Sequence, residues 1–300
     1  MSSLNLQVPR GSVYGLIGQN GAGKTTAIRL LMGLLLPDRG SARVLGNDFR
    51  TSPRALRARV GYVSQSQQLP AWMTLSELFR YAAHFYDRWD SDFARDRARA
   101  WRLAENRRVV EFSSGEQRKA AILLALAPRP EVVILDEPGA GLDPVARREL
   151  IDALVECIAR GDGATILFST HIISDIERVA DQVGVIDRGR MVASGPLEEF
   201  QSRVRRIQLI FPGETPPAGF TLPGALRVEV TGSVFTAVTQ FYDPAVIEAL
   251  RQETGVRVQV FPVGLEDIFL ELIGHINRGE PLSPVSDPIE NEKELKTEKL

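Results

Sequence analysis

The sequence predicts an α/β fold with a mainly parallel sheet. Near-continuous apolar segments at residues 132–135, 165–168 and 183–186 have the length of strands that are buried on both faces. Helical patterns at residues 144–160 and 174–180 lie between these segments. Because parallel strands need long crossover connections, this alternation favours a parallel sheet with helices on both faces.

The segments before these strands complete the predicted domain. A strand at residues 12–17 is followed by a helix at 27–32, and an edge strand is expected at 42–45, closed by a glycine. A short basic helix at 54–59 precedes an apolar strand at 60–63. These elements extend the same α/β pattern to the N-terminal part of the chain.

A helical insert is predicted over about residues 70–127. Thr74 and Glu77 have the spacing of a capping box, and the apolar residues after them recur on one helix face. Ser174 and Glu177 repeat the capping-box spacing before a later helix.

A change of pattern near residue 200 predicts a second domain. Residues 1–200 hold the alternating strands and helices, whereas residues 201–275 favour a small α+β domain. Its expected elements are strands at 205–211, 225–230, 234–239 and 256–260 and helices near 244–252 and 265–273. Residues 276–300 are polar, contain proline and are charged, which predicts a disordered tail.

Composition narrows the classes of function. The chain has 300 residues, of which 44% are apolar, and a formal net charge of −2 at pH 7. Its length allows a sizeable core, and its charge does not favour a nucleic-acid partner. The sequence lacks an apolar run near the ~20 residues that cross a bilayer, and it lacks a signal-peptide segment. We therefore expect a cytosolic protein whose membrane role, if any, comes through a partner.

A glycine-rich motif near the N-terminus carries the first chemical signal. Residues 18–26 read GQNGAGKTT and match the phosphate-loop pattern GxxxxGK[ST]. The glycines let successive backbone N–H groups point at phosphate oxygens, Lys24 supplies a positive charge, and the Thr25 hydroxyl is a ligand for Mg²⁺. The predicted nucleotide-binding residues of this loop are Gly18, Gln19, Asn20, Gly21, Ala22, Gly23, Lys24, Thr25 and Thr26.

Two acids follow the buried strand at residues 132–135. In a parallel sheet beside a phosphate loop, the first acid, Asp136, is placed to hold Mg²⁺ through water. The second acid, Glu137, lies outside the metal shell and suits a general base that polarises an attacking water. The pair predicts hydrolysis of a nucleotide rather than binding alone.

Four further motifs follow in a fixed order. They are Gln65 after GYVS, the segment FSSGE at 112–116, GLDP at 141–144, and His171 in FSTH. With the phosphate loop and the two acids, this order resembles that of the ABC-type ATPases over residues 11 to about 200. The resemblance implies a P-loop NTPase core of the RecA-like type, ATP and Mg²⁺ as nucleotide and cofactor, and hydrolysis of ATP to ADP and phosphate.

The resemblance also implies roles for residues around the phosphates. Gln65 is similar to the family glutamine that completes Mg²⁺ coordination beside Thr25 and Asp136 and senses the γ-phosphate. His171 is similar to the family histidine that contacts the γ-phosphate and holds the water activated by Glu137. Gln65, Glu137 and His171 are therefore the predicted catalytic residues.

A dimer is implied by the remaining motifs. Ser113 and Glu116 have capping-box spacing, so Ser113 begins a helix whose positive dipole end points outward. In the family, this helix end, with Gly115, meets the γ-phosphate bound by the opposite subunit, and Asp143 crosses toward the partner's phosphate loop. Each composite site then needs two chains, in a homodimer or a heterodimer.

The sequence departs from the family pattern in two places. The signature is FSSGE rather than LSGGQ, but Ser113 and Gly115 are kept, so function is expected to survive with altered tuning. An N-terminal strand with an adenine-stacking aromatic residue is not found before Val13, and Tyr14 is expected to pack in the core. This departure leaves two hypotheses, a misassigned start codon or weak selectivity for adenine.

Two segments indicate an exporter. Residues 84–90, HFYDRWD, and 265–272, LEDIFLEL, resemble bacterial export ATPases for drugs, antibiotics or lipids. The resemblance implies a separate integral-membrane subunit that docks near Gln65, with Trp72 and Met73 as rim contacts, and a peripheral place at the inner face of the plasma membrane. The transported substrate stays open.

Two other classes of function are alternatives. A soluble ABC ATPase that acts on DNA ends needs a very long coiled coil, and one that acts on ribosomes needs two cassettes, neither of which this sequence shows. A nucleotide-binding regulatory module without turnover is the third reading. Intact Glu137 and His171 argue against it.

Overall fold

Two compact units make up the chain, Met1–Arg190 and Met191–Leu300. The computed structural model describes residues 4–66, 68–159, 163–213, 215–217 and 219–277. The borders expected near residues 200 and 275 remain predictions. Of the tail expected at 276–300, the part from residue 278 onward lies outside the described residues.

The larger sheet has six strands in the order β2-β3-β4-β1-β5-β6. Its strands are β1 (Val13–Ile17), β2 (Val60–Val63), β3 (Val132–Asp136), β4 (Thr165–Thr170), β5 (Gln182–Asp187) and β6 (Arg190–Pro196). The pairs β2/β3, β3/β4, β4/β1 and β1/β5 are parallel, which confirms the predicted fold class. The carboxyl ends of β1, β3 and β4 therefore meet at one edge of the sheet, where the phosphate loop and the two acids follow.

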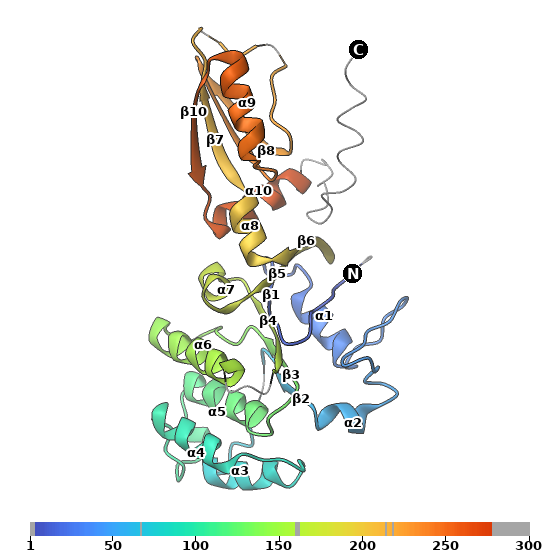
Figure 1. The fold of residues 1–300 in the computed structure, drawn as a ribbon. Helices are drawn as coiled ribbons and strands as arrows, with labels where there is room; N and C mark the ends of the chain where they lie inside the picture. Colours follow the sequence, from blue (N-terminus) through green and yellow to red (C-terminus); the bar gives the residue numbers. More distant parts are fainter. Residues whose placement is uncertain (1–3, 67, 160–162, 214, 218, 278–300) are drawn as a thin grey trace. The chain divides into compact units, whose positions relative to one another are not determined.

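Helices cover both faces of this sheet, as Figure 1 shows. The described helices of this unit are α1 (Lys24–Leu31), α2 (Pro53–Arg57), α3 (Leu75–Ala83), α4 (Ser91–Ala100), the 3₁₀ helix η1 (Val109–Glu111), α5 (Ser114–Leu126), α6 (Pro144–Ala159) and α7 (Ile173–Val179), of which α3 and α4 pack on α5. On one face α5 and α7 approach closely: a Cβ at Gly61 would lie 2.4 Å from the Ala125 carbonyl oxygen, and one at Gly15 would lie 2.2 Å from Ile176. Helix α1 contacts β3 on the other face, so the strands are buried between two helical layers.

The face that carries α1 also holds a groove of about 440 Å³, with Ile134 and Leu167 on the sheet side. Tyr14 is buried, with 1% of its surface exposed, as expected for a core residue. The edge strand predicted at 42–45 is wrong, since Val44 forms only an isolated bridge with Asn47 in the same turn. A strand forms only where a neighbouring strand can bond its N–H and C=O groups. The hydrophobic pattern of residues 42–45 does not reveal whether such a neighbour is present.

Apart from the capping box at Ser113, two boxes were predicted in this unit, and the one at Thr74 is confirmed. The Thr74 hydroxyl accepts the Glu77 N–H at 3.3 Å, and the Glu77 carboxylate accepts the Thr74 N–H at 2.8 Å, at the start of α3. The box predicted at Ser174 is wrong, because α7 already begins at Ile173 without a side-chain cap. The Thr170 hydroxyl instead accepts the Ile172 N–H at 2.9 Å just before that helix.

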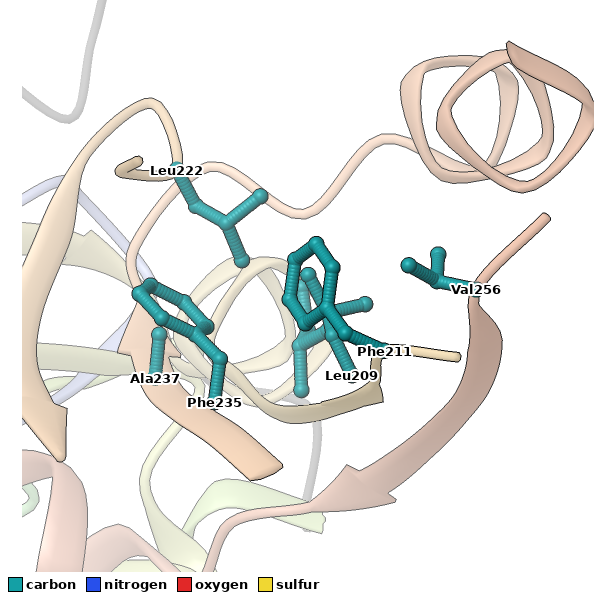
Figure 2. Packing of buried hydrophobic residues seen from close by; sticks show 7 residues of the cluster. Leu209, Phe211, Leu222, Phe235, Ala237 and Val256 are labelled. Carbon is teal, nitrogen blue, oxygen red and sulfur yellow. The ribbon is translucent and has the colours of Figure 1, made fainter. Parts of the chain in front are cut away.

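The second unit contains an antiparallel sheet of four strands in the order β10-β7-β9-β8. Its elements are α8 (Leu197–Arg203), β7 (Arg205–Ile210), β8 (Ala225–Thr231), β9 (Val234–Thr239), α9 (Pro244–Thr254), β10 (Arg257–Pro262) and α10 (Leu265–Asn277). Figure 2 shows its core, in which Leu209, Phe211 and Phe235 pack with Leu222 and Val256. Strand β6 and helix α8 were not predicted.

Membrane-spanning helices do not occur in the part of the chain that the structure describes, because none of its helices is both long and apolar enough.

Candidate nucleotide site

The phosphate loop connects β1 to α1. Gly21 and Gly23 have φ values of 82° and 111°, in the left-handed region that favours glycine. Gly23 is the N-cap of α1 and provides no side-chain hydrogen bond to the first N–H groups of the helix. These N–H groups, at the positive end of the helix dipole, form the kind of site that binds phosphate.

Lys24 is buried inside this loop, with 5% of its surface exposed. Its Nζ lies 2.6 Å from the Gly18 carbonyl oxygen and 3.3 Å from that of Gln19. It also forms an ion pair with Glu137 Oε1 at 3.0 Å. The positive charge that the sequence assigns to the phosphates thus lies against two carbonyl oxygens and the predicted base.

The geometry of Asp136 fits a magnesium ion. Asp136 is 1% exposed, and its Oδ1 accepts a hydrogen bond from the Thr25 hydroxyl at 3.1 Å. Its Oδ2 is buried and has no hydrogen-bond partner among the described residues. Because Mg²⁺ prefers hard oxygen ligands, a hydroxyl beside an unpartnered carboxylate oxygen is a donor set that suits it.

Glu137 joins the phosphate loop to the end of β4. Its Oε2 lies 2.8 Å from His171 Nδ1, while its Oε1 holds Lys24. Glu137 is buried and has a φ of 50°, a conformation that is uncommon for a residue with a side chain. The structure therefore brings Lys24, Thr25, Asp136, Glu137 and His171 together, as the sequence predicts.

Gln65 lies exposed after β2, outside this cluster. Its carbonyl oxygen accepts a hydrogen bond from Arg118 at 2.6 Å, and the Ser64 carbonyl accepts another from the same guanidinium at 2.7 Å. Burial lowers the pKa of Arg118. Arg118, which the sequence reading missed, thus ties the backbone at Gln65 to helix α5, and the predicted Mg²⁺ contact of Gln65 stays a prediction.

The signature residues lie at the N-terminus of α5. The capping box is confirmed: the Ser113 hydroxyl accepts the Glu116 N–H at 3.2 Å, and the Glu116 carboxylate accepts the Ser113 N–H at 2.7 Å. Arg107 pairs with Glu116 at 3.0 Å. Burial would raise the pKa of Glu116, but the hydrogen bonds from Ser113 and the charge of Arg107 outweigh it and lower the pKa.

Asp143 lies at the N-terminus of α6. Its carboxylate accepts the N–H groups of Val145 and Ala146, both at 2.9 Å. The bond from Ala146 is the main reason why the pKa of Asp143 is lowered. The structure thus places Ser113, Gly115, Glu116 and Asp143 at two helix N-termini rather than in the cluster around Lys24, and their role across a dimer interface stays a prediction.

Comparisons with known proteins identify the family. The family model described as "ABC transporter" matches residues 1–140. The Nod factor export ATP-binding protein I of Rhizobium johnstonii is 34% identical over 289 residues, which cover 91% of this chain and 90% of that protein. The protein of the same name from Ralstonia nicotianae is 33% identical over 291 residues, with 91% and 89% covered.

Solved structures agree with this assignment. The ATP-binding subunit of an ABC transporter has 34% sequence identity and a TM-score of 0.60, and the match covers 66% of this chain and 84% of that one. A dimeric bacterial ABC transporter cassette has 22% identity and a TM-score of 0.56, with 65% and 89% covered, and supports the fold. The chain therefore belongs to the ABC transporter family, as an ATP-binding subunit with ATPase activity.

Proposed function

We propose that this subunit hydrolyses MgATP at an interface between two cassettes and drives export through a separate membrane subunit. The cluster of Lys24, Asp136, Glu137 and His171 is the observation that carries the hydrolytic part. The export part rests on relatives that are named as export ATP-binding proteins and are 34% identical over most of their length.

Within one chain, the residues divide the chemistry among them. Glu137 is the general base, which takes a proton from the attacking water, and His171, 2.8 Å from its Oε2, orients the carboxylate. Lys24 exchanges its pair with Glu137 for the phosphate oxygens of ATP, which frees the Oε1 atom to face the water. A Mg²⁺ ion bound by Thr25, Asp136 and Gln65 would neutralise charge on the β- and γ-phosphates.

A second cassette supplies the other half of the site. The N-terminus of α5 carries the positive end of a helix dipole, and Ser113 on it is exposed. That end, with Gly115 and Glu116, contacts the γ-phosphate in the partner's phosphate loop, and Asp143 completes the interface. A monomer then hydrolyses ATP poorly because each site lacks its second wall.

The membrane subunit docks near the helical insert. Trp72 is 69% exposed, which is unusual for a tryptophan, and it lies a few residues beyond Gln65 with the half-buried Met73 beside it. A cytosolic helix of the membrane subunit that rests there would sense nucleotide through Gln65. The subunit is then peripheral at the inner face of the plasma membrane.

The variant Glu137→Gln tests the hydrolytic claim. Loss of the base should lower kcat by about 10²- to 10⁴-fold, while ATP binding remains and MgATP converts the variant into a stable dimer. Steady-state ATPase assays and light scattering with and without MgATP measure these quantities. Glu266→Gln, at an exposed position on α10, is the matched control and should behave as wild type. Equal rates for wild type and Glu137→Gln would remove the catalytic assignment.

A further inference from the structure

Ser169 connects the two acids through one hydroxyl group. It lies on β4 directly opposite Asp136 in the sheet register, and 0% of its surface is exposed. Its Oγ donates to Asp136 Oδ1 at 2.8 Å and accepts the Glu137 N–H at 2.9 Å. A single buried group thus contacts both the predicted metal ligand and the predicted base.

The hydrogen bond to Glu137 holds an unfavourable backbone conformation. Strand β3 ends at Asp136, so the next N–H group leaves the ladder, and Glu137 takes a φ of 50°. For a residue with a side chain this left-handed conformation is unfavourable, because Cβ comes too close to the following carbonyl oxygen. The bond from the Glu137 N–H to Ser169 stabilises the turn that aims the carboxylate at Lys24 and His171.

The hydrogen bond to Asp136 decides which carboxylate oxygen is available. Oδ1 accepts from two hydroxyls, Ser169 at 2.8 Å and Thr25 at 3.1 Å. Oδ2 is buried and without a hydrogen-bond partner in the described part of the chain. The two hydroxyls fix the rotation of the carboxylate, and they leave one oxygen for a cation.

We propose that Ser169 is a positioning residue that sets the orientation of both acids for MgATP hydrolysis. It acts through Asp136 and Glu137, so the inference rests on the function proposed above. Outer-shell groups of this kind change metal affinity or activity by about 10- to 100-fold when they are removed. A polar residue that only fills the core would affect stability alone.

The variant Ser169→Ala tests this proposal. The expected result is a kcat lowered about 10-fold and a Mg²⁺ concentration for half-maximal activity raised about 10-fold, with a nearly unchanged KM for ATP at saturating Mg²⁺. Binding of Mn²⁺ in the presence of ATP, followed by electron paramagnetic resonance, should weaken by a similar factor. This second measurement does not require turnover.

Thr165→Val is the matched control. Thr165 lies at the other end of β4, is buried, and its hydroxyl accepts the Gly11 N–H at 2.9 Å, so the change also removes a buried bond to a backbone N–H. It should lower the melting temperature without changing kcat or the Mg²⁺ dependence. If Ser169→Ala behaves in the same way as this control, the positioning role is refuted.

Two further results keep the test decisive. Should Ser169→Ala fail to fold, Ser169→Cys replaces it, since a thiol of similar size makes weaker hydrogen bonds. We expect this variant to show an intermediate loss of kcat and of Mn²⁺ affinity. Wild-type values for both would overturn the proposal. If wild type itself does not hydrolyse ATP, the proposed function fails, whereas the effect on Mn²⁺ binding still decides the role of Ser169.

Discussion

The carboxyl edge of the larger sheet and the N-termini of α5 and α6 both carry polar motif residues, but they are built differently. At the sheet edge, Lys24, Asp136 and Glu137 are at most 5% exposed; Lys24 pairs with Glu137, and Asp136 accepts hydrogen bonds from the Thr25 and Ser169 hydroxyls. At the helix ends, Ser113 and Asp143 are exposed, and each bonds N–H groups within its own first turn.

The two regions differ in whether the same residues serve both stability and catalysis. At the sheet edge the same residues contribute to both, because their charges are buried and depend on one another. At the helix ends, Ser113 and Asp143 already cap their own helices and still face solvent. Their contribution to catalysis therefore requires a second chain. Changes at the sheet edge should lower both stability and activity, whereas changes at the helix ends that keep the cap should lower activity alone.

The largest expected effect is that of Lys24→Met. ATP binding and hydrolysis should be lost, and the free energy of unfolding should fall by about 3 kcal/mol because Glu137 is left buried without its cation. Denaturation without nucleotide can be followed by tryptophan fluorescence, since Trp72, Trp89 and Trp101 all lie in the first unit.

The double variant Lys24→Met/Glu137→Gln is the control for this prediction. It removes both charges of the pair, so it should regain most of the lost stability and none of the activity. If the single and the double variants are equally unstable, the pair between Lys24 and Glu137 does not contribute to stability and the contrast with the helix ends fails.

A mixing experiment gives the next largest effect. Ser113→Asp keeps a good N-cap for α5 but places a negative charge where the partner's γ-phosphate binds, so the variant should fold as wild type and be inactive. Mixed with the inactive Lys24→Met, it should recover about a quarter of the wild-type ATPase, since half of random dimers carry one intact composite site of two.

Gln252→Ala serves as the partner in a control mixture with Lys24→Met, because Gln252 lies exposed on α9 and both signatures stay intact. That mixture reports how mixed dimers perform when only the phosphate loop is damaged. An absence of recovery in the mixture of Ser113→Asp with Lys24→Met would mean that signature and phosphate loop act within one chain.

Local features of the chain could be predicted from the sequence, whereas contacts between distant segments could not. Thr74 with Glu77 and Ser113 with Glu116 were found because capping boxes depend on local spacing. The strand expected at 42–45 failed because pairing depends on a neighbour that local pattern does not reveal.

Long-range contacts account for what was missed at the site. The position of Ser169 between the acids depends on the register of β3 with β4, which one sequence does not specify. Its only signal was a polar residue at the end of an apolar strand. Arg118 was missed for a similar reason, since its bonds run from α5 to the end of β2.

The smallest predicted effect concerns Asp175, which is buried in the first turn of α7 and has no role in the proposed hydrolysis. Burial raises the pKa of its carboxyl, and the negative charge of Glu137 raises it further; Arg147, a hydrogen bond with Thr170 and the neighbouring His171 oppose the rise only in part. The folded state therefore binds this proton more tightly than the unfolded state. Stability from this group is full below the unfolded pKa, near 3.9, and declines as the pH rises toward the higher folded pKa.

Asp175→Asn should therefore raise the melting temperature slightly at pH 7.5 and not at pH 4, because the amide cannot ionise in its buried site. Asp96→Asn, whose side chain is 72% exposed, is the matched control and should show little change at either pH. Melting curves by tryptophan fluorescence without nucleotide measure both. A loss of stability at pH 7.5 would contradict this prediction, because it would show that the charged groups around Asp175 stabilise its carboxylate by more than burial destabilises it.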